Sequence, residues 1–156
     1  MKKLNSLIKY ILVIMVSAMF ILTTVQVILR YGFNTALSWS EELVRFIFVW
    51  ATLLGAAIGI KEHIHIGVDA VVNLLPAHLR RFADTLVYLI IFAFGLFLII
   101  ASLQVVAVTH PQLSPALDLR MSYVYAALPV SGFFFMLYSA LEIVLIWKKR
   151  NAQKEG

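Results

Sequence analysis

The sequence predicts an all-α integral membrane protein with four transmembrane helices. Of its 156 residues, 62% are hydrophobic and only 13% are charged, whereas a soluble domain is about one-quarter charged. The charged residues stand between apolar runs, and each run is long enough to cross a bilayer core of roughly 30 Å as a helix. Lipid is therefore the expected solvent. The length of the chain suits a single membrane domain over residues 1–156 without a sizeable extramembrane lobe.

The apolar runs define four spans. They cover about residues 10–29, 41–60, 85–109 and 121–147. Lys2 and Lys3 precede the first run, as in a signal peptide, but the run is longer than a signal h-region and lacks a small-residue cleavage site. We therefore expect an uncleaved first span. Between Arg45 and Lys61 the second run has no formal charge and is apolar on every face, which is typical of a membrane helix.

The connections between spans have their own patterns. Residues 64–84 are predicted to form an interfacial amphipathic segment, in which Pro76 begins a further helix. If that helix continues to Thr109, it is longer than the bilayer core is thick. Pro111 and Pro115 predict an extended or turn-rich connection before the fourth span. Pro129 predicts a kink within that span, because it removes a backbone hydrogen bond.

The basic residues predict the orientation of the spans. With an inner N-terminus, ten of the thirteen lysines and arginines fall on inner segments. The outer segments hold Arg30, Arg45 and Arg120. This positive-inside bias predicts that both termini face the cytoplasm. The same distribution argues against nucleic-acid binding despite a net charge of +5, because the basic residues flank apolar spans and form no stripe.

Polar residues gather where the second span begins. Ser38 and Glu41 fit a capping box, and Glu41 and Glu42 fall where the helix dipole favours carboxylates. Arg45 is placed to pair with either carboxylate across one turn. These groups could serve the helix start at the headgroup level, or one of them, with neighbouring Trp39, could bind a partner protein. The spacing does not decide between the two interpretations.

A stripe of small residues follows in the same span. Ala51, Gly55 and Gly59 recur at intervals of four, and the last two form a GxxxG motif that allows close helix approach in lipid. The stripe could pack within this chain or against another subunit. Trp50, near the middle of the span, is a further candidate for a subunit interface.

Histidines and acids suggest little chemistry of their own. His65 and Asp69 would share a helix face, but His63 and His65 would point apart, and a metal site needs more ligands than these. The chain has no cysteine, so it offers no thiolate nucleophile or cysteine-ligated cluster. Glu142, near the inner end of the fourth span, is expected to pair with a basic residue or reach the membrane surface.

The absence of a chemical site favours a scaffolding role over an enzyme or a self-sufficient transporter. Ionisable residues within spans mark ion and substrate pathways, and here they cluster at the span ends. Two alternatives stay open. A self-associating proton-coupled exporter would need an essential acid, for which Glu142 is the candidate. A haem-bearing membrane anchor would need facing histidines within the spans, whereas the histidines of this chain lie outside them. They are His63, His65, His78 and His110.

The region around the second span resembles the small membrane subunit of tripartite ATP-independent periplasmic (TRAP) transporters, the DctQ-like family. The similar elements cover about one-quarter of the chain. In order, they are Arg30-Tyr31-x-Phe33-Asn34, Trp39-x-Glu41-Glu42, Arg45, Phe48-x-Trp50, Leu54-Gly55-Ala56 and His65-x-x-x-Asp69. Each element is weak alone, but their order and spacing are fairly specific.

The resemblance implies a subunit of a sodium-coupled importer of organic acids in the bacterial inner membrane. It implies a large multi-span partner that moves substrate, and a periplasmic binding protein that captures a dicarboxylate, a sugar acid or sialic acid. The small subunit would brace the large one and help dock the binding protein. Sodium and substrate sites would lie in the large subunit, so no cofactor is expected in this chain. Candidate interface residues are Arg30, Trp39, Glu41, Glu42, Arg45, Trp50, Ala51, Gly55, Gly59, His65 and Asp69.

Overall fold

The chain forms long helices that run up and down as two hairpins. The computed structural model describes residues 2–35, 37–62 and 77–152. Within these ranges the helices are α1 (Lys2–Gly32), α2 (Ser38–Lys61), α4 (Ala77–Thr109), α5 (Met121–Tyr125) and α6 (Ala127–Ala152). Four helical stretches are long and apolar enough to cross a membrane, and they match the four predicted spans.

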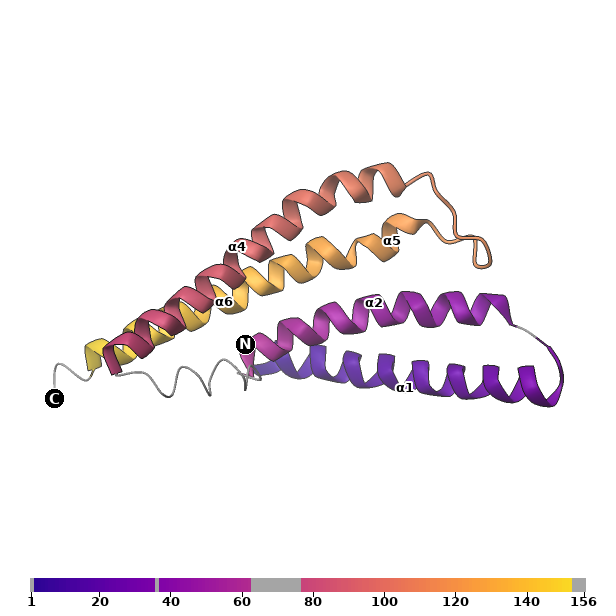
Figure 1. The fold of residues 1–156 in the computed structure, drawn as a ribbon, viewed down its shortest axis with the longest axis horizontal. Helices are drawn as coiled ribbons and strands as arrows, with labels where there is room; N and C mark the ends of the chain where they lie inside the picture. The colour runs from indigo at the N-terminus through magenta and orange to yellow at the C-terminus, as the bar shows by residue number, and fades with distance from the viewer. Residues whose placement is uncertain (1, 36, 63–76, 153–156) are drawn as a thin grey trace.

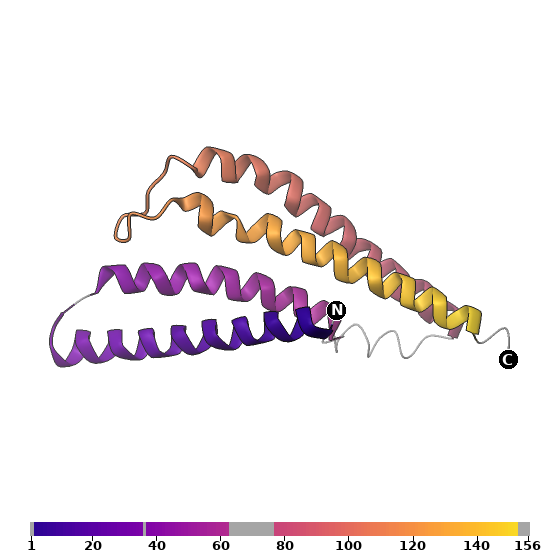
Figure 2. The ribbon, with the colours of Figure 1, turned by 180° about the vertical axis from the view of Figure 1, so that it is seen from behind.

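The two hairpins, α1–α2 and α4–α6, diverge toward one end of the molecule (Figure 1, and from behind in Figure 2). We call this the loop end, because it carries the connections 33–37 and 110–120. The N-terminus and the last turn of α2 lie away from the loop end, and α4 and α6 extend beyond them in the same direction (Figure 1). We call this side of the molecule the terminal end. Helix α2 packs on both α1 and α6, so it joins the hairpins.

Helix α4 begins at Ala77, next to the predicted helix start at Pro76, and runs without a break to Thr109. Residues 77–84 are its first turns, and their place at the membrane interface stays a prediction. The apolar periodicity of Leu79, Phe82 and Leu86 continues directly into the third span, which explains the unbroken helix. At 1.5 Å per residue the helix is about 50 Å long, which exceeds the bilayer core and requires tilt or an overhang. The rest of the predicted interfacial segment lies outside the described residues.

The fourth span is interrupted, as its proline predicts. Helix α5 ends at Tyr125 and α6 begins at Ala127. Pro129 has no N–H to donate to the carbonyl of Tyr125 four residues earlier. Backbone hydrogen bonding resumes at Val130, whose N–H donates to the Ala126 carbonyl with an N···O distance of 3.2 Å. The predicted kink therefore appears as a break just before the proline.

A close helix contact joins α4 to α6 at two glycines. A Cβ built on Gly95 would lie 2.8 Å from the carbonyl oxygen of Gly132, and one built on Gly132 would lie 2.8 Å from the oxygen of Gly95. Phe94 and Phe135 stack beside this contact, with ring centroids 6.2 Å apart. Because small residues allow backbones to approach in lipid, the two glycines set the spacing of the second hairpin.

The buried core lies where the two hairpins meet. Tyr138 is 1% exposed and Ala57 is fully buried. The core side chains come from α1, α2, α4 and α6. They are Ile8, Leu54, Ala57, Ile58, Ile60, Tyr88, Phe135 and Tyr138. Much of the remaining apolar surface is exposed, α1 above all, as expected where lipid or another subunit replaces water.

We expect Gly132→Ala to lower the thermal stability of the chain in detergent. An alanine in a helix is ordinarily favoured over glycine by up to about 1 kcal/mol, but here its methyl group would collide with a backbone carbonyl. Gly55→Ala is the matched control, since a Cβ there meets no atom within 4 Å. Thermal unfolding followed by circular dichroism should show a lower midpoint for Gly132→Ala alone. Equal midpoints for the two variants would contradict the close contact.

Candidate partner-binding surface

The start of α2 is not closed by the predicted capping box. Leu37 occupies the N-cap position and makes no side-chain cap, and Ser38 is the first residue of the helix. The helix begins one residue earlier than predicted. The side-chain hydrogen bond at its start comes from Ser40, whose hydroxyl donates to the Leu37 carbonyl at 2.9 Å. The same hydroxyl oxygen accepts a hydrogen bond from Gln26 Nε2 at 2.7 Å. Ser40 is 1% exposed, so it fastens α2 to α1.

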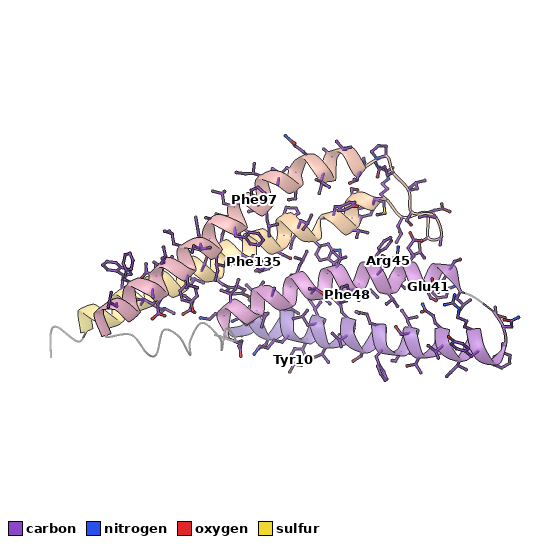
Figure 3. All side chains as sticks on the ribbon, viewed as in Figure 1. Tyr10, Glu41, Arg45, Phe48, Phe97 and Phe135 are labelled. Carbon is purple, nitrogen blue, oxygen red and sulfur yellow. The ribbon has the colours of Figure 1, made fainter. Side chains whose placement is uncertain are left out.

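Glu41 pairs across the first hairpin with Arg30. Arg30 Nη1 lies 3.5 Å from Glu41 Oε1, and the two side chains are 63% and 50% exposed. An ion pair this exposed stabilises the fold by at most about 1 kcal/mol. The predicted pairing with Arg45 is absent: within the described ranges, Arg45 makes no ion pair with either carboxylate. Figure 3 shows Glu41 and Arg45 at the loop end of α2.

Glu42 holds the connection between the third and fourth spans. Its carboxylate is buried, and Oε2 accepts hydrogen bonds from the backbone N–H groups of Ala116 at 2.9 Å and Leu117 at 3.0 Å. Hydrogen bonds to a charged group contribute more than neutral ones, about 1.5–3 kcal/mol each. Glu42 therefore ties the start of α2 to a loop more than 70 residues away. This pairing could not be anticipated from local spacing.

The loop held by Glu42, residues 110–120, has a defined turn structure. Leu113 and Arg120 form an isolated antiparallel bridge, and Asp118 adopts a positive φ of 51°. The Ser114 N–H donates to the Leu119 carbonyl at 2.8 Å. This agrees with the turn-rich connection that the two prolines predicted. Leu113 (59% exposed) and Leu119 (42%) present apolar side chains at its surface.

His110, at the start of this loop, is exposed but not isolated. Its Nδ1 lies 3.3 Å from the hydroxyl oxygen of Ser122, and its Nε2 contacts the Arg120 guanidinium. These contacts tie the two ends of the loop together.

The small-residue stripe on α2 is not used within the described chain. Ala51, Gly55 and Gly59 are only partly buried, and a Cβ added at either glycine would meet no atom within 4 Å. The glycines that do lie against a neighbouring backbone are Gly95 and Gly132. A surface able to accept another helix is therefore left open along α2.

The two tryptophans proposed as interface residues differ in their surroundings. Trp50 packs against the core, and its indole N–H donates to the Tyr123 carbonyl at 3.2 Å, so it links α2 to α5. Trp39 is 42% exposed at the loop end. His65 and Asp69 lie outside the described residues.

The terminal end is fastened by polar contacts between helices. Lys61 of α2 pairs with the nearly buried carboxylate of Glu142 in α6 at 2.5 Å, which confirms the predicted basic partner of this acid. Lys9 pairs with Glu62 at 2.8 Å on a more exposed surface. The Tyr138 hydroxyl donates to Asn5 Oδ1 at 2.9 Å. Among the residues described by the structure, no three histidines or carboxylates come together as metal ligands.

Comparison with known families gives one match across most of the chain. The family of tripartite ATP-independent periplasmic transporters, DctQ component, matches residues 19–149. The C4-dicarboxylate TRAP transporter small permease protein DctQ of Vibrio cholerae is 38% identical over 63% of this chain. A putative TRAP transporter small permease protein of Haemophilus influenzae is 26% identical over 90% of this chain and 87% of its own length.

Coverage of these relatives is uneven. The chain spans 42% of the Vibrio cholerae protein. The sialic acid TRAP transporter permease protein SiaT of Haemophilus influenzae is 27% identical over 87% of this chain, but over only 22% of its own length. A region similar to nearly all of this chain is thus part of a much longer permease.

We expect Glu42→Ala to loosen the loop at residues 114–119. The substitution leaves the two loop N–H groups without their acceptor, so their hydrogen exchange should accelerate on the order of tenfold or more. Glu41→Ala, one residue away and exposed, is the matched control. Hydrogen–deuterium exchange measured by mass spectrometry of the loop peptide tests this. Unchanged protection in Glu42→Ala would show that the carboxylate does not hold the loop.

We expect Lys61→Met to destabilise the chain by about 2 kcal/mol, because it removes a charge-assisted contact to the buried Glu142 carboxylate. Lys9→Met removes the cation of an exposed pair and should cost less than about 1 kcal/mol. Thermal unfolding of the two variants in the same detergent compares them directly. Equal losses would contradict the structural role of the Lys61–Glu142 pair.

Proposed function

Because this chain belongs to the family of DctQ components of TRAP transporters, we propose that it braces the large subunit of a sodium-coupled importer of organic acids. One observation carries this proposal above the others. A permease from Haemophilus influenzae contains a region similar to 87% of this chain within a protein of which that region is only 22%. The rest of that permease indicates the size of the partner subunit that we propose for this chain.

The geometry supports a bracing role more than a translocating one. The charged side chains on α2 that face other elements serve internal contacts: Glu42 holds a loop, and Lys61 neutralises Glu142. Because Glu42 and the Lys61–Glu142 pair are engaged in these contacts, neither offers a binding site for an ion that crosses the membrane. The open stripe at Ala51, Gly55 and Gly59 offers a surface on which a helix of the large subunit can pack. In this proposal the substrate and sodium sites lie in the large subunit, and this chain has neither a cofactor nor an enzymatic activity.

The loop end supplies a surface for a soluble partner. We assign it to the periplasm and both termini to the cytoplasm, in the bacterial inner membrane, because the basic residues concentrate at the terminal end. The loop of residues 110–120 then faces the periplasmic binding protein with Leu113 and Leu119 exposed. Glu42 keeps the loop in one shape, which lowers the entropic cost of docking.

The substrate class follows the relatives. Two of the relatives compared above are named for C4-dicarboxylate and sialic acid TRAP transporters, and both substrates are organic acids. We therefore propose a dicarboxylate, sugar acid or sialic acid as substrate, captured by the binding protein.

Affinity purification from a mild-detergent membrane extract, followed by mass spectrometry, tests the proposal. We expect one large multi-span protein in roughly equal amount. Gly55→Leu should reduce its recovery, because the side chain fills the stripe, whereas Ala56→Leu on the neighbouring face should not. Recovery of the chain alone and self-associated would contradict the proposal. Undiminished recovery with Gly55→Leu would exclude the stripe as the contact surface.

A further inference from the structure

A cavity of about 250 Å³ opens between α2 and the start of the fourth span at the loop end. Its walls are almost entirely apolar. They come from Phe46 and Val49 on one side and from Met121, Val124, Tyr125 and Leu128 on the other, and Arg45 completes the lining. We call this the Arg45 groove.

The groove lies at a defined depth along the spans. Arg45 is seven residues after the start of α2, and Leu128 is seven residues after the start of the fourth span at Met121. At a helical rise of 1.5 Å per residue, both lie about 10 Å from the loop end of their spans. The long side chain of Arg45 can keep its guanidinium toward the headgroups while its stem stays in apolar surroundings. The groove therefore spans the boundary between the headgroups and the acyl chains of one leaflet.

The Arg45 guanidinium makes no ion pair within the part of the chain that the structure describes. The Glu41 carboxylate pairs with Arg30, and Glu42 Oε2 accepts hydrogen bonds from two loop N–H groups. Asp118 lies in the exposed turn of the loop. An exposed guanidinium beside an apolar cavity is thus left with hydrogen-bond donors that no carboxylate of the described residues accepts.

We propose that the Arg45 groove binds one phospholipid of the surrounding leaflet. An acyl chain would fill the apolar part, and the phosphate would accept hydrogen bonds from the Arg45 guanidinium. The planar fork of arginine suits two oxygens of one phosphate. A phospholipid satisfies both halves of the site at once, because it carries phosphate oxygens that accept from the guanidinium and an apolar chain on one molecule. The bound lipid fills the space between α2 and α5 where the two hairpins diverge.

Native mass spectrometry of the full chain tests the site. The protein is purified in mild detergent after reconstitution into vesicles containing phosphatidylglycerol, and the number of retained lipids is counted. We expect about one tightly held phospholipid per chain. Arg45→Gln should lower its retention on the order of tenfold, as the loss of a charge-assisted hydrogen bond requires, and Val49→Phe should lower it by filling the cavity. Lys148→Gln, which removes an exposed cation at the terminal end, is the matched control and should retain the lipid.

Three results would overturn the proposal. Equal retention by wild type, Arg45→Gln and Val49→Phe would show that no lipid occupies the groove. If Arg45→Gln lowers lipid retention but Val49→Phe does not, the lipid contacts only the Arg45 charge at the surface and does not enter the cavity. A photo-crosslinker at Val49 that captures a protein in place of a phospholipid would show that another subunit covers the groove. The test does not depend on the identity of the transported substrate or of the large subunit.

Discussion

Buried carboxylates in this bundle must find their partners within the protein, because lipid supplies none. Helix α2 meets this constraint at both of its ends. At the loop end, Glu42 accepts hydrogen bonds from two backbone N–H groups of the connection between α4 and α5. At the terminal end, Lys61 neutralises Glu142 of α6. Between these two contacts the apolar core joins the hairpins, together with the hydrogen bond from the Trp50 indole N–H to the Tyr123 carbonyl. The relative placement of the hairpins therefore depends on the core and on polar contacts at the two ends and in the middle of α2.

This arrangement separates the surfaces that the chain completes by itself from those it leaves open. The glycines at 95 and 132 bring α4 and α6 together so closely that no methyl group fits between them. The glycines at 55 and 59 have no such neighbour among the described residues, although only this second pair lies in a GxxxG motif. The difference indicates that α4 and α6 are closely packed at their glycines, whereas α2 keeps a face on which another helix can pack. A scaffolding subunit requires both properties: internal rigidity and an unfilled face.

The sequence predicted the four spans, the turn-rich loop and the break near Pro129, because hydropathy and proline chemistry act locally. Long-range partners were beyond such reasoning. The spacing of Glu42 and Arg45 indicated a pair one helical turn apart, yet Glu42 turns to a loop some 70 residues distant. Likewise, Ser38 and Glu41 match a capping box in sequence, but the helix starts one residue early and Ser40 bonds to Leu37 and Gln26. Gly95 carries no motif at all, and only the fold reveals its contact. The interface candidates on α2 followed from small-residue spacing, but which stripe stays open depended on three-dimensional packing.

The most direct test of the central claim is site-specific cross-linking from the open face of α2. The chain has no cysteine, so a benzophenone maleimide attaches only where Gly55→Cys or Ala56→Cys provides one. Irradiation in native membranes should join Gly55→Cys to a large multi-span protein and leave Ala56→Cys without that adduct. A Gly55→Cys adduct found only with lipid, or only with a second copy of this chain, would contradict the account of α2 as the face that braces a larger subunit.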